Sequence, residues 1–233
     1  MNVNHVMAIF EKDLKEFMRN MMLLTLPFIP PFIALMYSRI DMGGEGLPLS
    51  MIYIIVGTTF ASVTAGGMMT SMAEENEKKT LRGLGQSPAT FIDIIAGKSL
   101  VFLIMTVTSL LASYLILSIE GFFSVKVVIG LILSCFFFLM LGISIGILSK
   151  SIAATSAYIM PILFLFGFTP MIEMAIQSPD HLARQIASYF PIYQNVALHE
   201  EAFQLQPFIV LVAWLLIAGI VAYLAFNKKL KDD

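Results

Sequence analysis

The segment EENEKKTLRGLGQSPATFIDIIAGK, residues 74–98, gathers acidic and basic side chains between two long apolar stretches of the chain. The whole sequence of 233 residues is 58% hydrophobic and 13% charged, whereas a soluble domain carries about 25% charged residues. So apolar a composition is typical of a membrane protein. Because charged groups are costly in lipid, the 74–98 segment must lie in water or against another protein.

Six stretches are apolar and long enough to cross a bilayer, which takes about 20 residues. They are residues 21–38, 49–72, 99–118, 127–148, 152–172 and 207–226. Pro27, Pro30 and Pro31 predict a kinked or interrupted helix in the first stretch, and Pro170 can end the fifth early. The expected fold is an all-α polytopic membrane protein with a single transmembrane domain over residues 21–226.

Lysine and arginine accumulate on the cytoplasmic side of a membrane, and their distribution predicts the orientation of the chain. With the N-terminus inside, only Arg39, Lys126 and Arg184 fall in outside segments. The basic residues that fall inside are Lys12, Lys15, Arg19, Lys78, Lys79, Arg82, Lys98, Lys150, Lys228, Lys229 and Lys231. We therefore expect both termini, the tail over residues 227–233 and the charged segment in the cytoplasm, and residues 173–206 outside.

Residues 1–20 alternate apolar and charged positions at helical spacing and lack the features of a cleavable signal peptide. The apolar positions are Val3, Val6, Met7, Phe10, Leu14, Phe17 and Met18. This pattern predicts an amphipathic helix lying in the membrane interface. A helix packed on the cytoplasmic side of the protein itself fits the pattern equally well.

The six stretches contain no Asp, Glu, Lys, Arg or His as drawn, so an ion-coupled carrier, which needs titratable groups at membrane depth, is disfavoured. No cluster of Cys, His and carboxylate residues has the spacing of metal ligands. A net charge of −2 without a basic block gives no indication of nucleic-acid binding. Gly97-Lys98-Ser99 resembles the end of a phosphate-binding loop, but Ile92 stands where its first glycine is needed.

Gly142-Ile143-Ser144-Ile145-Gly146 matches G-x-S-x-G, the pattern of a nucleophile elbow. A catalytic serine needs a base, and all three histidines lie outside the predicted spans. Gly142 and Gly146 also form G-x-x-x-G, which permits close packing of helices. We favour packing, and we expect no catalytic residue and no metal ligand in this chain.

Local signals divide the 74–98 segment into two helical pieces. Acidic residues favour a helix start near Glu74, and Gly85 is a stop signal. Ser87 and Pro88 then have the order of an N-cap and a first helical residue, so the second piece should continue into the third span. Spacing alone leaves a solvated connector as an equal alternative.

The segment resembles the signature of the type-2 ATP-binding-cassette (ABC) permease family, which reads approximately E-x-E-x-x-T-L-x-x-L-x-x-S-P followed by G-K. The matching residues are Glu75, Glu77, Thr80, Leu81, Leu84, Ser87, Pro88, Gly97 and Lys98. Such permeases have six spans, an interfacial N-terminal helix and short external re-entrant helices before the last span. The resemblance therefore covers essentially the whole chain.

In this family the loop between spans two and three forms a coupling helix that docks on a separate cytoplasmic ATPase. The resemblance implies that Glu75 and Glu77 face basic groups of that ATPase. Thr80, Leu81, Arg82 and Leu84 would form the rest of the contact, and Ser87 and Pro88 would set the angle between the coupling helix and span three.

Residues 173–206 resemble the external segment that such permeases use as an outer lid over the exit path, although a plain structural cap fits the sequence equally well. Glu173, Pro191 and Tyr193 are the candidate gate residues, and Glu173 is also placed to cap a polar turn.

The resemblance implies a non-catalytic permease subunit of an ABC exporter in a bacterial plasma membrane. It would bind no cofactor itself, because ATP and magnesium would be held by a dimer of ATPase subunits, and it would pair with a second permease copy or paralogue. Apolar spans suggest a hydrophobic or amphipathic cargo such as a peptide, an antibiotic or a lipid-like compound. The main alternative is a non-transporting scaffold or regulatory subunit of a resistance or signalling system.

Overall fold

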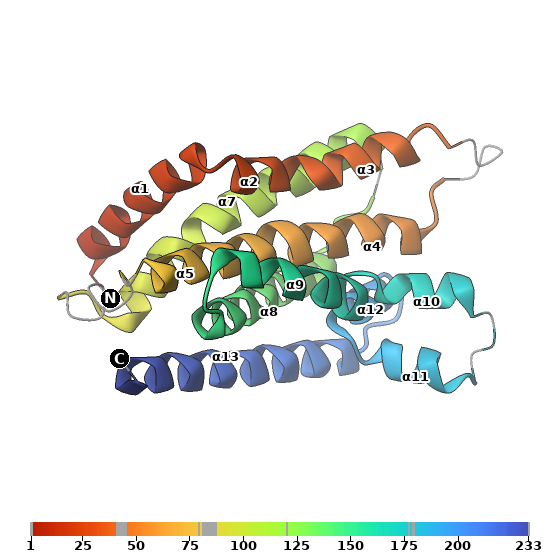
Figure 1. Ribbon diagram of the computed structural model, residues 1–233. Coiled ribbons are helices and arrows are strands. Elements are labelled where there is room, and N and C mark those ends of the chain that lie inside the picture. The colour runs from red at the N-terminus through yellow and green to blue at the C-terminus, as the bar shows by residue number, and fades with distance from the viewer. Residues whose placement is uncertain are drawn as a thin grey trace.

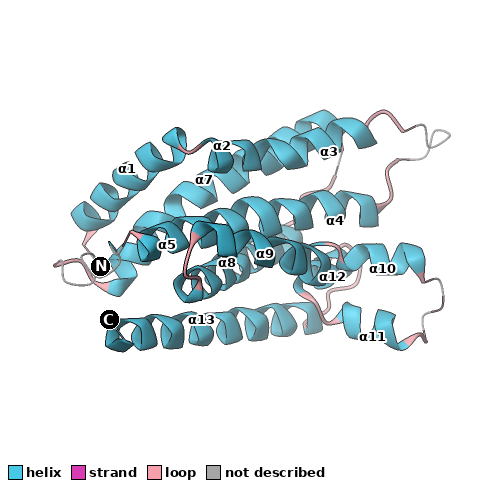
Figure 2. Ribbon diagram, in the orientation of Figure 1, coloured by secondary structure: helices cyan, strands magenta, loops and turns pink. Residues whose placement is uncertain are grey.

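The computed structural model describes residues 2–40, 46–78, 80, 88–119, 121–176, 178 and 180–232, and every regular element in these ranges is a helix (Figure 2). The elements are α1 Val3–Arg19, α2 Met21–Thr25, the 3-10 turn η1 Leu26–Phe28, α3 Ile29–Tyr37, α4 Leu49–Thr58, the π-helical η2 Thr59–Gly66, α5 Gly67–Glu77, α7 Phe91–Leu117, α8 Val125–Leu148, α9 Ile152–Ile162, the π-helical η3 Leu163–Gly167, α10 Thr169–Ala175, α11 Leu182–Ser188, α12 Pro191–Ala197 and α13 Gln206–Asp232. The long helices run side by side as a bundle (Figure 1). The prediction of an all-α polytopic protein is confirmed.

Four helices are long and apolar enough to cross a membrane, and six spans result if each of two bent helix pairs counts as one. The four are Leu49–Glu77, Ile92–Leu117, Val125–Leu148 and Gln206–Lys229. They overlap four of the predicted spans, but the second runs to Glu77 because the helix continues into the charged segment. The third begins at Ile92 rather than at residue 99 and therefore includes Asp93 and Lys98, and the last runs on to Lys229, so the prediction that the spans are free of charged residues is wrong at these ends.

The first and fifth predicted spans are the interrupted ones. Pro27 lies in the 3-10 turn between α2 and α3, so the predicted interruption of the first span is a local change of helix type within Met21–Tyr37, and the large bend lies before it at Asn20. α1 turns away from Met21–Tyr37 by 84°. The fifth span breaks earlier than predicted, after Gly167, where α10 departs by 58° and Pro170 lies in its first turn.

The start of α7 differs from the expected one. Thr90 is its N-cap: the Asp93 backbone N–H donates to the Thr90 hydroxyl over 3.2 Å, and the Thr90 N–H donates to Asp93 Oδ2 over 3.0 Å. Two backbone donors are satisfied by this reciprocal pair, which a Ser87–Pro88 cap would not provide. The prediction that Pro88 occupies the first helical position is therefore wrong, whereas the continuation of this helix into the third span is confirmed.

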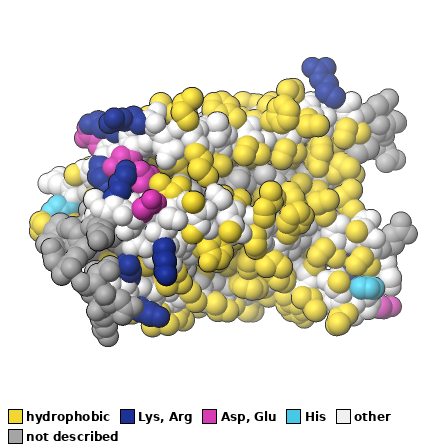
Figure 3. Space-filling view, viewed as in Figure 1, with side chains coloured by type: hydrophobic (Ala, Val, Ile, Leu, Met, Phe, Trp, Pro, Cys, Tyr) yellow, Lys and Arg dark blue, Asp and Glu magenta, His cyan; other side chains and the backbone are white. Residues whose placement is uncertain are grey.

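Both termini and the residues that flank the charged segment lie at one end of the bundle, which we call the proximal end (Figure 1). α10, α11 and α12 lie at the opposite, distal end. One face of the molecule shows charged side chains mainly at the proximal end and a broad hydrophobic belt between the ends (Figure 3). This relative placement is the one predicted from the basic residues.

Small residues bring α8 against the continuous helix α4–η2–α5. A Cβ atom added to Gly142 would lie 2.5 Å from the Ala65 carbonyl oxygen, and one added to Gly146 would lie 2.6 Å from that of Met69. The Ser144 hydroxyl donates to the Met140 carbonyl within the same helix over 2.7 Å. The packing interpretation of this motif is confirmed, and the Ser144 hydroxyl is hydrogen-bonded to the backbone of its own helix.

Candidate functional site

α1 lies against the first turns of α7, which follow the charged segment in the chain (Figure 1). Val6, Ile9 and Phe17 are buried on this face of α1. The approach is close at Gly97, where an added Cβ would lie 2.8 Å from the Ile9 Cβ and from the Val6 carbonyl oxygen. The structure therefore matches the second interpretation of residues 1–20, a helix packed on the protein itself.

A cluster of four charged side chains joins α1, α5 and α7 beneath this contact. The Lys98 ammonium is fully buried and lies 2.9 Å from Asp13 Oδ2 and 2.9 Å from Glu75 Oε1. Lys12 reaches the same Glu75 oxygen over 2.7 Å, and the Ser71 hydroxyl lies 3.4 Å from the Lys98 ammonium. We call Lys12, Asp13, Glu75 and Lys98 the ionic cluster.

The ionic cluster contains two cations and two anions, so its formal charge is balanced. Asp13 and Glu75 are almost fully buried, whereas Lys12 is partly exposed. Burial is the largest single influence and acts to lower the pKa of Lys12, but the charge and hydrogen bond of Glu75 together with the charges of Asp13 and Glu16 outweigh it, and the pKa lies above its ordinary value. Because a buried ion is tolerated only with close partners, the four side chains depend on one another.

Glu75 is therefore placed differently from what the resemblance implied. Instead of facing outward at the end of α5, its carboxylate points into the chain toward Lys12 and Lys98. The helix turns Glu77, two residues later, to the surface, where its Oε2 accepts a hydrogen bond from the Ile152 backbone N–H over 2.9 Å. Glu77 thus links the end of α5 to the start of α9.

Of the other predicted contact residues, the structure describes only Thr80 and Pro88. Thr80 and Pro88 are exposed, and the Thr80 hydroxyl donates to the Glu75 carbonyl over 3.3 Å. Leu81, Arg82, Leu84 and Ser87, together with the predicted turn at Gly85, lie outside the described residues. Two residues of the ionic cluster thus lie on either side of the residues from Glu77 to Pro88: Glu75 precedes them in the chain and Lys98 follows them.

At the distal end the structure brings together two of the three candidate gate residues. Arg184 of α11 lies 2.6 Å from the Glu173 carboxylate of α10. The Tyr193 hydroxyl and, more weakly, this carboxylate hold the pKa of Arg184 above its ordinary value, although desolvation opposes them. Pro191 is buried at the first position of α12, so it helps to anchor that helix rather than lining an open surface.

α12 is held to the rest of the bundle by polar and aromatic contacts. The Asn195 side chain donates to the Ser134 hydroxyl of α8 over 2.6 Å, and both residues are fully buried. His199 Nε2 lies 2.9 Å from the Tyr53 hydroxyl of α4. Burial and, secondarily, the charge of Lys126 lower the pKa of His199.

The burial of Asp13 and the partners of Lys98 were not predicted from the sequence. Asp13 follows Val6 and Ile9 and precedes Phe17 at helical spacing, so it lies on the buried stripe of α1 and not on the polar face. A carboxylate on an apolar stripe and a lysine two turns into an apolar helix are a usable signal, because each requires a buried partner of opposite charge. The signal does not identify which residues pair.

Comparison with known proteins supports the assignment of this architecture. The comparison with curated sequences gave no match. The sequence model for the ABC-2 family transporter protein matches residues 45–227, a range that runs from the start of the second span through most of α13 and includes the charged segment. Since this range is most of the chain, the protein belongs to the ABC-2 family of membrane transporter proteins.

Proposed function

We propose that the chain is the permease subunit of an ATP-driven exporter and that the part of the charged segment from Glu77 to Pro88 docks on a separate ABC ATPase. The observation that carries the proposal is the family match over residues 45–227, which includes the last five predicted spans and this segment. Its support from the structure is that exposed Glu77, Thr80 and Pro88 lie around a segment rooted in two predicted membrane-crossing helices. Movement of the segment would act on α5 and α7 directly.

The ionic cluster connects the two helices from which this segment extends, the end of α5 and the start of α7, which we call its roots. Glu75 of α5 pairs with Lys98 of α7, and Lys98 also pairs with Asp13 of α1. A force applied by an ATPase between the roots would therefore be passed to three helices together. In this proposal Glu75 is an internal anchor, while Glu77 remains a candidate for contact with a basic group of the ATPase.

The proposed cargo is a hydrophobic or amphipathic compound, such as a peptide, an antibiotic or a lipid-like molecule. Its support is the apolar character of the four helices that satisfy the criterion for membrane spans. The chain would act with a second permease copy or paralogue and two ATPase subunits, and it would lie in a bacterial plasma membrane with both termini in the cytoplasm.

Charge reversal at Glu77 tests the proposed contact. Wild-type protein purified from its native host should bring with it a protein that contains an ATP-binding cassette, identified by mass spectrometry. We expect Glu77→Lys to recover much less of that ATPase while the permease remains folded and monodisperse, with only the small loss of thermal stability that follows from losing the exposed hydrogen bond to the Ile152 N–H. Glu11→Lys is the matched control, because Glu11 is an exposed carboxylate of α1 outside the segment. Equal recovery of the ATPase by both variants would exclude Glu77 from the contact, and a wild-type protein without any ATPase would contradict the function itself.

A further inference from the structure

A groove separates α7 from α8, although these helices follow one another in the chain. α7 packs on α1, α3 and η2, whereas α8 packs on α5, η2 and α13. The groove has a volume of about 330 Å³, and its base includes buried Phe60 of η2 and Cys135 of α8. Its rim includes Val107 and Leu111 of α7 and Ile132 of α8, which are about half exposed. Both helices are long and apolar enough to cross a membrane, and the half-exposed residues of the rim are all apolar, so we infer that the open side faces the hydrocarbon of the bilayer.

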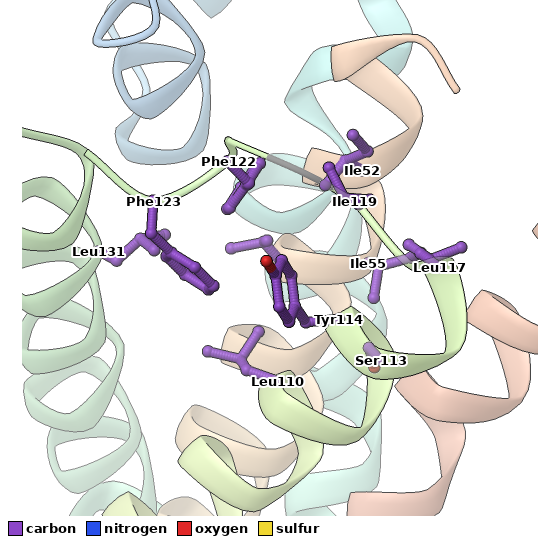
Figure 4. A pocket seen from close by; sticks show the side chains of 11 residues that line it. Ile52, Ile55, Leu110, Ser113, Tyr114, Leu117, Ile119, Phe122, Phe123 and Leu131 are labelled. Atoms are coloured by element: carbon purple, nitrogen blue, oxygen red, sulfur yellow. The ribbon is translucent and has the colours of Figure 1, made fainter. Parts of the chain in front are cut away.

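The apolar surface continues toward the distal end. Leu110 and Leu131 line both the groove and a smaller neighbouring pocket. In that pocket Tyr114 of α7 and Leu131 of α8 point into a common space, with Phe122 and Phe123 of the connecting segment beside them (Figure 4). The rings of Tyr114 and Phe123 lie 4.9 Å apart between centroids. The resulting surface is elongated along the helices.

The chemistry of the groove selects an apolar occupant. Thr106 provides the one hydroxyl among the lining residues outside the smaller pocket, and its oxygen is already hydrogen-bonded to the Thr64 hydroxyl over 2.7 Å. Apart from this threonine and the Cys135 thiol, the lining is hydrocarbon or aromatic. A polar ligand would lose its hydration without gaining partners there, whereas a hydrocarbon chain gains dispersion contacts with the walls.

The side chains of the groove also argue against a second helix as the occupant. Close packing of membrane helices uses small residues, as Gly142 and Gly146 do where α8 meets η2 and α5. The groove lining contains no glycine, alanine or serine. A flexible chain fits between bulky side chains such as Val107 and Ile132, which a helix backbone cannot approach closely.

We propose that the groove between α7 and α8 is a binding site for one acyl chain of a bilayer phospholipid. The acyl chain lies along the helices with its methyl end against Phe60 and Cys135. It fills the space between α7 and α8 and so completes the packing between them. The site goes beyond the proposed function, since it does not depend on what the protein transports or on an ATPase.

Photolabelling in proteoliposomes tests this site. The full-length protein is reconstituted with a phosphatidylglycerol that carries a diazirine near the end of one acyl chain, and labelled residues are identified by mass spectrometry after illumination. Lipid that merely surrounds the protein reaches exposed residues of every span. Only an acyl chain inside the groove reaches Phe60 and Cys135, so we expect labelling at these two residues and none at Phe137, which is buried on the face of α8 that packs against Trp214 of α13.

Variants that fill the groove provide the second arm of the test. Val107→Trp should reduce labelling at Phe60 and Cys135 several-fold and leave labelling of α13 unchanged. Val212→Trp is the matched control, because Val212 is an exposed valine on α13 outside the groove. If Val107→Trp does not fold, Leu111→Trp replaces it, and the wild-type labelling pattern still decides. Labelling confined to exposed residues, undiminished labelling of the base in both groove variants, or disulfide cross-linking of two Ile132→Cys chains in a Cys135→Ser background would overturn the proposal.

Discussion

At the proximal end the molecule buries the ionic cluster, whereas at the distal end the ion pair of Glu173 and Arg184 lies partly in water. The Lys98 ammonium is fully enclosed between Asp13 and Glu75, while the Arg184 and Glu173 side chains are 21% and 36% exposed. The two ends also differ in what joins their helices. Ion pairs between segments that are far apart in the sequence hold the proximal end, and neutral hydrogen bonds and aromatic rings hold the distal end.

The aromatic contacts of the distal end centre on Trp214 of α13. Its ring lies 5.5 Å from that of Phe166 and 5.6 Å from those of Phe137 and Phe190, between centroids. Its indole N–H donates to the Tyr189 carbonyl over 2.7 Å. Such contacts tolerate small shifts, because ring packing is less directional than a buried ion pair. The comparison indicates that the distal helices can move at lower cost than the roots of the charged segment.

Removal of the buried cation is expected to have the largest effect. Lys98→Met leaves Asp13 and Glu75 close together without the central ammonium. Breaking a buried ion pair by removal of one partner costs about 3–5 kcal/mol. We expect a large loss of thermal stability, measured as the temperature at which the detergent-purified protein loses its monodisperse elution profile.

Two further variants separate charge from packing at Lys98. Lys98→Met combined with Asp13→Asn should recover part of the lost stability, since one of the two uncompensated anions is removed. Lys15→Met is the control, because Lys15 pairs with Glu11 at the surface of α1 with both side chains about 70% exposed. If Lys98→Met were as stable as Lys15→Met, the ionic cluster would not hold the proximal end together.

The sequence was sufficient to predict the parts of the fold that the bilayer itself imposes. Uninterrupted hydropathy gave the four long spans, and Pro27 gave the local change of helix type in the first predicted span, because a proline removes a backbone donor wherever it stands. The small residues Gly142 and Gly146 gave the close contact of α8. Each of these features follows from residues that are neighbours along the chain.

The features that the sequence did not predict depend on tertiary contacts. The partners Asp13, Glu75 and Lys98 come from three helices, so their pairing follows from the docking of α1 and not from local spacing. The π-helical turns of η2 and η3 carry no local signature. The end of η3 packs on α4 just before η2, where an added Cβ on Gly57 of α4 would lie 2.0 Å from the Gly167 carbonyl oxygen. The start of α7 at Phe91 was mispredicted because Ser87–Pro88 and Thr90–Asp93 are both plausible caps and only one matches the packed position of the helix.

A smaller effect is expected from protonation of His199 at the distal end. Its lowered pKa means that the folded chain holds this proton less tightly than the unfolded chain does. The contribution to stability is therefore complete above the ordinary histidine pKa of about 6.5 and decreases as the pH falls through that value toward the lower pKa of the folded state. We expect the melting temperature of the wild type to decrease between about pH 7.5 and about pH 5.5.

The variant His199→Gln isolates this contribution. Glutamine retains a polar side chain for the Tyr53 hydroxyl but does not titrate, so its melting temperature should depend less on pH than that of the wild type. His5 and His181 are present in both proteins and cancel in the difference. The same pH dependence in both proteins would show that protonation of His199 does not weaken the distal end.

The smallest effect is expected from neutralising the distal ion pair with Glu173→Gln. Water screens a partly exposed pair, and such pairs contribute about 1 kcal/mol or less to stability, so the melting temperature should change by less than about 4 °C. Salt sharpens the comparison, because exposed charges are screened within about 8 Å at physiological ionic strength and buried ones much less. At high salt the difference between Glu173→Gln and the wild type should vanish, whereas the defect of Lys98→Met should persist. A defect in Glu173→Gln as large as that of Lys98→Met, and equally resistant to salt, would mean that the distal helices are fixed by charge as firmly as the proximal ones.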